Sequence, residues 1–321
     1  IAKKEKYFYK KSDVKNFNNF FNSIIYKIIP KAFLENFKNI NSAVKNFWPQ
    51  KVNQILSHNF THDDVLKIWI ANMRLKKAKL YMFQHGGYFG INKFHHGEDL
   101  ESLLGDKFFT WGWKNSNKKL VPFHSLRFST SKLAIPIKRE MKRKNIIFCI
   151  TSQTKYLNLP GFFPRNNLER IERLFLIKDT LKKLNREIRE KIIIRYMKVQ
   201  FLGNYSFFNK KFFGKNLKFD DGSIKLINYL SNASLVIHDN HSTGWLETIF
   251  YNIPTVIIID KNIEIFRNNF NKHLDELKKN KIIHFSTSSL TNFLNKNYNN
   301  IERWWSSNQV QNSVQSFKKE Y

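Results

Sequence analysis

Three small residues and a carboxylate stand between two apolar stretches in the segment HDNHSTGWLETIFYNIPTVIIID. Ser242, Thr243 and Gly244 follow a predicted strand and begin a predicted helix, and Glu247 lies about one turn further on. The free amides at a helix start and the two hydroxyls favour an anion such as phosphate, and Gly244 lets that anion approach the backbone. Glu247 follows Gly244 by three residues, so a Ser/Thr capping box does not explain it, and its carboxylate suits two ribose hydroxyls. An ordinary capped helix is the alternative that this segment alone leaves open.

A second group of chemically active residues surrounds the glycine-rich loop FQHGGYFG. His85 follows a predicted strand, and Gly86 and Gly87 after it leave room for a ligand against the backbone. An imidazole at this place can act as a base near neutral pH or bind phosphate. Glu101, preferred narrowly over Glu98, can fix its tautomer or share the proton transfer. The alternative is a loop histidine that is hydrogen-bonded to the backbone.

Other candidate ligand-binding residues stand at the ends of apolar stretches. Arg195 ends the stretch IIIR, where its fork of donors suits a phosphate or a sugar carboxylate, and a surface arginine is the alternative. Ser152 ends the stretch NIIFCITS and is expected to face the same crevice. His95 and His96 stand near acidic residues, but their spacing matches no metal signature, so no metal site is predicted. The tryptophans of TWGW are interpreted as core residues rather than as a sugar-stacking surface.

Short apolar stretches alternate with helical ones along most of the chain. This pattern predicts parallel sheets covered by helices on both faces, with strands at 52–58, 79–84, 107–113, 145–152, 191–197, 234–239 and 254–260. A basic, irregular stretch near 114–144 separates two α/β sets, which gives domains at 1–130 and 131–321 with a crevice between them. Ligands of such sheets bind beyond the carboxyl ends of the strands, which is where the candidate residues stand.

The amino-terminal 50 residues are basic, aromatic and helical in pattern, and Pro30 is expected to divide them into two helices. Phenylalanine and isoleucine recur at near-helical spacing, which favours helices that pack on the protein over an amphipathic helix on a membrane face. The chain starts at Ile1, and we interpret it as a fragment or as a protein whose start lies upstream.

Composition limits the function classes. The 321 residues carry a net charge of +30, spread along the chain, which we attribute mainly to compositional bias with weak attraction for anions rather than to a dedicated polyanion or membrane surface. The one cysteine, Cys149, excludes an internal disulfide and fits a reducing compartment. No apolar run has the length of a membrane-spanning helix.

Four separated motifs resemble a family of transferases encoded in bacterial surface-polysaccharide loci (O-antigen and capsule). The matching residues are Gln84 to Gly87, Thr110 to Trp113, Arg195–Tyr196, and Ser242, Thr243, Leu246 and Glu247. The order of strand, Ser-Thr-Gly, Leu-Glu and a Pro-led strand is also similar to the donor-site element of GT-B glycosyltransferases. The resemblance covers about residues 52–260, and it extends to transferases of Kdo and related acidic sugars.

The resemblance implies an α/β fold of the GT-B type, in which two Rossmann-like domains with parallel sheets face a cleft. The first domain would be incomplete here, because family members are longer at the amino end. It implies a glycosyltransferase that needs neither metal nor cofactor. The enzyme would move a sugar from a nucleotide-sugar donor, of which a CMP-linked sugar is one candidate, to a surface-glycan acceptor. His85 and Glu101 would be catalytic, and the donor would be bound by Gln84, Gly86, Gly87, Ser152, Arg195, Ser242, Thr243, Gly244 and Glu247.

The expected partners are a nucleotide sugar and a glycan or lipid-linked glycan, together with peripheral contact with an anionic membrane. The expected location is the cytoplasm, at the cytoplasmic face of the inner membrane. A sugar-nucleotide epimerase or polyol-phosphate transferase on the same fold remains an alternative. A basic nucleic-acid-binding protein is another, although no helix-turn-helix, zinc finger or RNP-type motif supports it.

Overall fold

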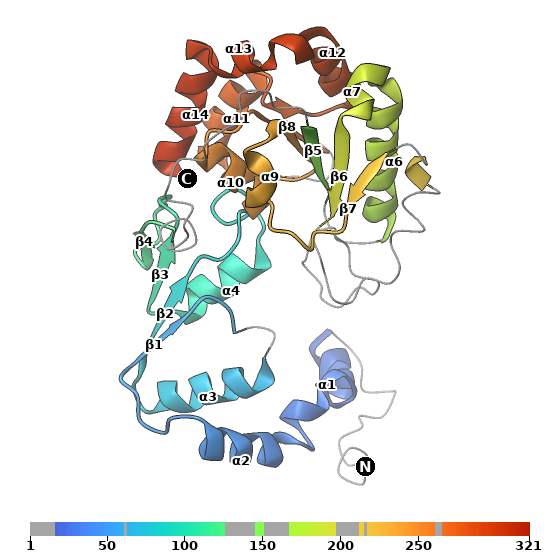
Figure 1. Cartoon of the computed structure of the whole chain (residues 1–321). Helices are drawn as coiled ribbons and strands as arrows, with labels where there is room; N and C mark the ends of the chain where they lie inside the picture. Colours follow the sequence, from blue (N-terminus) through green and yellow to red (C-terminus); the bar gives the residue numbers. More distant parts are fainter. Residues whose placement is uncertain are drawn as a thin grey trace. The chain divides into compact units, whose positions relative to one another are not determined.

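The computed structural model is an α/β protein with two sheets (Figure 1). It describes residues 17–60, 63–125, 145–150, 167–196, 212–214, 217–260 and 265–321. The chain divides into two compact units, Ile1–Met82 and Phe83–Tyr321. The predicted domain boundary at 130/131 lies outside the described residues and stays a prediction.

The first unit contains helices and the first strands of the smaller sheet. Its elements are α1 (Phe17–Ile28), the 3-10 turn η3 (Lys31–Phe33), α2 (Phe37–Phe47), β1 (Gln54–Ser57), α3 (Asp64–Leu75) and β2, which runs from Lys79 to Phe83. Pro30 separates α1 from α2, as predicted. The expected packing role is wrong for α1, because none of its residues is buried, whereas Val44 of α2 is buried. Helix α3 begins after Asp63, whose carboxylate accepts a hydrogen bond from the Leu66 amide at 3.0 Å.

The smaller sheet has the strand order β1-β2-β3-β4. Within the second unit, helix α4 (His96–Leu104) precedes β3 (Lys107–Thr110), which pairs in parallel with β4 (Leu120–Pro122). The strand predicted over 107–113 is three residues shorter in the structure. It ends at Thr110 because Gly112 adopts a φ of 104°, a conformation that is incompatible with a strand.

The larger sheet belongs to the second unit and has the order β10-β9-β8-β5-β6-β7, with parallel pairing throughout. Its strands are β5 (Asn145–Ile150), β6 (Ile192–Tyr196), β7 (Lys218–Asp220), β8 (Ala233–His238), β9 (Thr255–Ile258) and β10 (Ile283–His284). All residues of β8 and β9 are buried, as expected for central strands covered on both faces. The predicted α/β class with two parallel sheets is confirmed.

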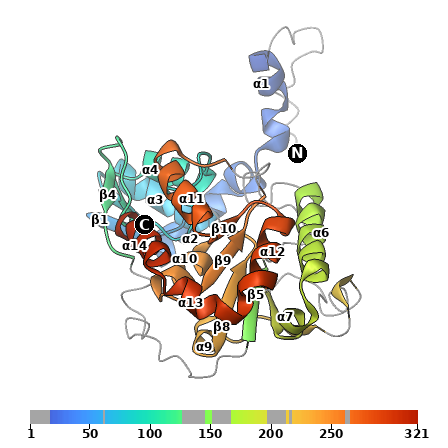
Figure 2. The same ribbon diagram turned by 90° about the horizontal axis from the view of Figure 1, so that it is seen from above.

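Helices cover both faces of the larger sheet (Figure 2). On one face, Phe148 and Ile237 pack with residues of α6 (Asn167–Lys183) and α12 (Thr287–Asn297). On the other face, Ile257 packs with Trp245 and Phe317 of α10 (Thr243–Phe250) and α14 (Asn308–Glu320), together with α11 (Asn268–Lys279). The remaining elements are α7 (Arg186–Glu190), α9 (Ile227–Leu230), η5 (Tyr298–Asn300) and α13 (Ile301–Trp305).

Candidate functional site

The start of helix α10 lies directly after the carboxyl end of β8. Ser242 is the N-cap residue, and its side chain makes no capping hydrogen bond. The Ser242 amide donates to the Asn240 side-chain oxygen at 2.9 Å, and Asn240 in turn donates to the Asp239 carboxylate at 3.0 Å. The next two amides, of Thr243 and Gly244, find no acceptor within the described residues. This helix start therefore offers two backbone donors and two hydroxyls to an anion.

The glycine-rich loop packs against this helix start. A Cβ atom on Gly87 would lie 2.6 Å from the Ser242 carbonyl carbon and from the Thr243 nitrogen, which is closer than real Cβ atoms come. Only glycine fits there, because the atoms in the way are backbone. His85 is two residues away, so its Cα lies within about 7.6 Å of that of Gly87. The predicted proximity of the His85 loop and the α10 start is therefore present in the structure.

The other two predicted glycines are less constrained by their neighbours. A Cβ atom on Gly244 would lie 3.5 Å from the His238 ring, an ordinary van der Waals contact. A Cβ atom on Gly86 would lie 3.2 Å from the Phe89 ring, which is tight but meets a side chain. Packing within the chain therefore requires glycine at 87 alone of these three positions. A requirement for close ligand approach at Gly86 and Gly244 stays a prediction.

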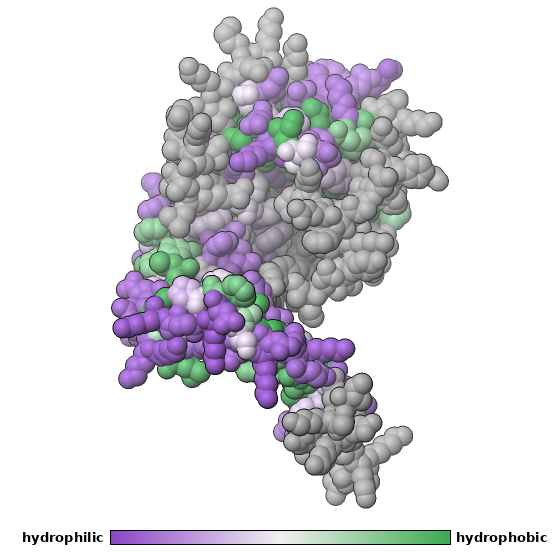
Figure 3. Space-filling view, turned by 60° about the horizontal axis from the view of Figure 1, so that its bottom comes forward, coloured by the Kyte–Doolittle hydropathy of each residue, from purple (hydrophilic) through white to green (hydrophobic). Residues whose placement is uncertain are grey.

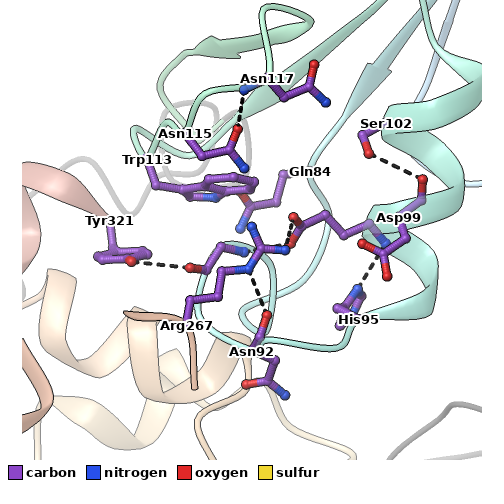
Figure 4. Close-up of polar contacts among 12 residues, drawn as sticks. Gln84, Asn92, His95, Asp99, Ser102, Trp113, Asn115, Asn117, Arg267 and Tyr321 are labelled. Atoms are coloured by element: carbon purple, nitrogen blue, oxygen red, sulfur yellow. Dashed lines mark hydrogen bonds and ion pairs between the residues drawn. The ribbon is translucent and has the colours of Figure 1, made fainter. Parts of the chain in front are cut away.

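Gln84 joins the glycine-rich loop to the TWGW segment (Figure 4). Its side-chain oxygen accepts hydrogen bonds from the Trp111 amide at 2.8 Å and from the Trp113 indole at 2.7 Å. Its side-chain nitrogen donates to the Gly86 carbonyl at 2.8 Å. Gln84 therefore holds the loop in place, and its contact with a donor stays a prediction. Both tryptophans are buried, as their interpretation as core residues requires.

His85 and Glu101 face each other across the loop. The Nδ1 atom of His85 lies 3.7 Å from a carboxylate oxygen of Glu101, which stands on α4 and is only 1% exposed. Burial raises the pKa of Glu101 to about 8, and the charge of Glu98 acts in the same direction. At neutral pH this carboxyl holds its proton. Glu101 can therefore take up or release a proton near pH 8 beside the His85 ring, which suits acid–base chemistry.

Glu98, the second candidate carboxylate, is engaged elsewhere. One of its oxygens accepts from the Gly90 amide at 2.7 Å, and the other accepts from the Arg267 guanidinium at 2.5 Å. Arg267 also donates to the Asn92 carbonyl at 2.8 Å (Figure 4). Burial raises the pKa of Glu98, and Arg267 opposes that effect. Sequence reasoning missed Arg267, which stands in no motif and is 169 residues from Glu98 along the chain.

Two histidines beside the loop, the partly exposed His95 and the buried His241, are held in the neutral form. His95 is the N-cap residue of α4, and its Nδ1 accepts from the Glu98 amide at 3.0 Å. Burial lowers its pKa to about 4. The Nε2 of His241 donates to the Asn92 side-chain oxygen at 2.5 Å, and burial lowers the pKa of His241 to about 3. Neither of these two rings changes charge near neutral pH. His85 is the better candidate for proton transfer because it faces the carboxyl of Glu101.

Arg195 is buried, which excludes the alternative of a surface arginine. It is 9% exposed, forms an ion pair with Asp220 of the neighbouring strand, and donates to the Ile224 carbonyl. Asp220 therefore neutralises its charge within the protein. Binding of a phosphate or sugar carboxylate by Arg195 stays a prediction.

The polar residues after the central strands gather around Cys149. Burial raises the pKa of this thiol to about 12, while the charge of Arg195 opposes the shift and those of Asp239 and Glu247 add to it. Cys149 pairs with Arg195 of β6 and with His238 of β8 in the register of the sheet, so Arg195 stands beside this thiol. Glu247 is 5% exposed. Ser152, expected at this edge, lies outside the described residues.

Over the described ranges, no group of three His, Cys, Asp or Glu side chains is arranged to hold a metal ion. The sequence predicted no metal site. The site as described consists of a helix start with free amides, a glycine loop packed against it, and a pair formed by the partly exposed His85 and the buried Glu101.

The family model for the LIC12162 family transferases matches residues 2–321. The chain belongs to this transferase family. No curated protein matches it by sequence comparison. This match is consistent with the expectation of a transferase and leaves the O-antigen and Kdo relation as a prediction.

Several solved structures resemble the chain weakly. A candidate UDP-N-acetylglucosamine 2-epimerase from Listeria monocytogenes is 10% identical, with a TM-score of 0.47 over 87% of this chain and 75% of that protein. The spinosyn rhamnosyltransferase SpnG, complexed with spinosyn aglycone, is 10% identical, with a TM-score of 0.46 over 90% and 74%. MurG from Acinetobacter baumannii is 12% identical, with a TM-score of 0.43 over 89% and 78%. At these values the likenesses carry over neither substrate nor mechanism.

Proposed function

We propose that this LIC12162-family chain is a glycosyltransferase of the GT-B type that moves a sugar from a nucleotide donor to a bacterial surface glycan. The observation that carries the proposal is the close packing of Gly87 on the backbone of Ser242 and Thr243. It brings a candidate proton acceptor, His85, next to a helix start suited to a phosphate. Sugar transfer from a nucleotide sugar needs these two functions at one place.

In the proposed reaction, the donor phosphates bind at the free amides of Thr243 and Gly244 and at the hydroxyls of Ser242 and Thr243. Glu247 binds the ribose hydroxyls. The acceptor hydroxyl gives its proton to His85 while its oxygen forms a bond to the anomeric carbon. The bond from that carbon to the phosphate oxygen breaks, and the phosphate leaves with the electron pair.

Two features support this assignment of roles. The α10 dipole and its amides stabilise the negative charge that develops on the leaving phosphate, so we expect transfer to need no divalent metal. The buried Glu101 holds its proton at neutral pH and lies 3.7 Å from the His85 ring, so it can share a proton with that ring during the transfer.

Donor binding is tested first. We expect calorimetry against CMP-, UDP-, GDP- and CDP-linked ligands to identify one nucleotide, and Glu247→Ala to lose about 1.5–3 kcal/mol of its binding free energy. Thr248→Ala is a matched control on the same helix, since the Thr248 hydroxyl is bonded within the chain to the Trp245 carbonyl at 2.9 Å. Equal affinity of wild type and Glu247→Ala for the bound nucleotide would exclude the ribose role.

Transfer is tested by product analysis with the nucleotide sugar that binds. A glycan lengthened by one sugar, formed equally well with a metal chelator present, is the expected result. An epimerised free nucleotide sugar would instead assign the alternative epimerase activity to the same site.

A further inference from the structure

Helix α1 of the first unit carries an apolar stripe that none of the described residues covers. Phe17, Phe20, Phe21 and Ile28 are 74%, 47%, 39% and 58% exposed, and α1 contains no buried residue. With Ile24, these positions follow helical spacing and lie on one side of the helix. The opposite side is mostly polar and carries Asn19, Asn22 and Ser23 together with Tyr26.

The apolar surface continues into the elements that follow α1 within the same unit. Phe33, Phe37 and Phe47 are 39%, 41% and 84% exposed. In Figure 3, green hydrophobic side chains are interspersed with purple hydrophilic ones on the exposed surface of this unit. Single exposed apolar residues are ordinary in proteins, but a succession of seven large ones within 31 residues marks an interaction surface.

The charge of the same segment indicates which kind of partner binds this surface. Residues 17–51 contain five lysines and one acidic residue, namely Lys27, Lys31, Lys38, Lys45, Lys51 and Glu35. An anionic lipid bilayer fits both properties, because its headgroups attract lysines and its acyl chains accept phenylalanine side chains. A nucleic acid would pair with the lysines and leave the phenylalanines in water.

Two other occupants of the stripe are disfavoured by the same charge. A second copy of the chain carries a net charge of +30 and would be repelled. Residues 1–16 of the chain contain six lysines against two acidic residues, so they too are basic and lack charge complementarity with this segment.

We propose that α1 and the segment 31–47 form a membrane-docking surface that lies in the interface of an anionic bilayer. The apolar stripe of α1 rests at the level of the outer acyl chains, and the lysines lie among the anionic headgroups. No helix among the described residues is long and apolar enough to cross a membrane. The docking is therefore peripheral, and it does not depend on the proposed transferase chemistry.

The test is co-sedimentation of the full chain with vesicles of phosphatidylcholine alone and of phosphatidylcholine with one third phosphatidylglycerol. We expect strong binding to the anionic vesicles, weaker binding to the neutral ones, and partial release by salt. The double variant Phe17→Ser/Phe21→Ser should bind the anionic vesicles at least about tenfold more weakly, because it removes two inserting side chains. The control is Leu75→Ser, which changes an 85% exposed residue at the end of α3, outside the stripe, and should bind as wild type does.

A second measurement distinguishes the bilayer from a protein occupant. An environment-sensitive dye on Phe20→Cys, in a Cys149→Ala background, should shift to the blue only when anionic vesicles are added, and brominated lipids should quench it. A blue-shifted dye without vesicles would show that protein covers the stripe and would overturn the proposal. Equal binding of wild type and Phe17→Ser/Phe21→Ser, or equal binding to both kinds of vesicle, would also overturn it.

Discussion

The start of α10 and helix α1 differ in how much of their side-chain surface is buried. Around α10, several polar side chains are buried, and some are paired with residues far away in the sequence, such as His241 with Asn92. In α1, the apolar side chains are exposed. In the first region, packing holds a few atoms at fixed distances from one another, as a catalytic site requires. The second leaves apolar surface available, as a docking surface requires.

Removal of the His85 imidazole tests most directly whether the α10 region is catalytic. If the α10 region is the catalytic one, His85→Ala should lower the transfer rate by about 10²–10⁴-fold. Nucleotide affinity should change little, because the donor groups of α10 remain. Steady-state kinetics and calorimetry on the same preparation measure both quantities. His96→Ala is the control, since His96 is exposed at the start of α4. A variant at 85 that transfers sugar at the wild-type rate would refute the catalytic role.

The buried carboxyl of Glu101 gives a prediction about pH. Its folded-state pKa, about 8, lies above the ordinary value of 4.5, so the folded protein holds a proton that the unfolded chain releases between these values. The contribution of Glu101 to wild-type stability should therefore fall as the pH rises from 5 to 8. Glu101→Gln lacks this titration, so its stability relative to wild type should rise over that range by on the order of a few kcal/mol.

Urea unfolding at pH 5, 6, 7 and 8 measures this difference. Asp99→Asn is the control, because Asp99 is an exposed carboxylate on the same helix. A stability difference between wild type and Glu101→Gln that stays constant with pH would show that Glu101 is not protonated in the folded protein.

Two glycine variants distinguish a glycine that is needed for packing within the chain from one that is needed for close approach of a ligand. Gly87→Ala places a Cβ atom against the backbone of the α10 start and should destabilise the protein by about 2–3 kcal/mol. Gly244→Ala meets only an ordinary contact and should change stability by less than about 1 kcal/mol. If phosphate approaches the backbone at Gly244, that variant should nevertheless bind nucleotide more weakly. Thermal unfolding and calorimetry separate the two effects, and equal stability losses would contradict the observed packing.

The sequence by itself determined the class of fold and the position of the candidate residues along the chain. Runs such as SLVIH and TVII are mostly apolar, which is why both were recognised as strands, and Ser242 follows the first of them as an N-cap residue. Strand and cap patterns depend on neighbouring residues, so local reasoning finds them. The sequence also indicated a division at Pro30 for the same reason.

Only the tertiary structure decided which of these residues meet. Gly87 packs on Thr243, and Glu98 pairs with Arg267, which leaves Glu101 beside His85. The partners of the first two pairs are separated by more than 150 residues, and no local pattern specifies such contacts. The sequence also did not predict the exposure of α1, because an amphipathic stripe has the same pattern whether it packs on protein or faces solvent. Burial is a property of the folded surroundings, and the helix alone does not encode it.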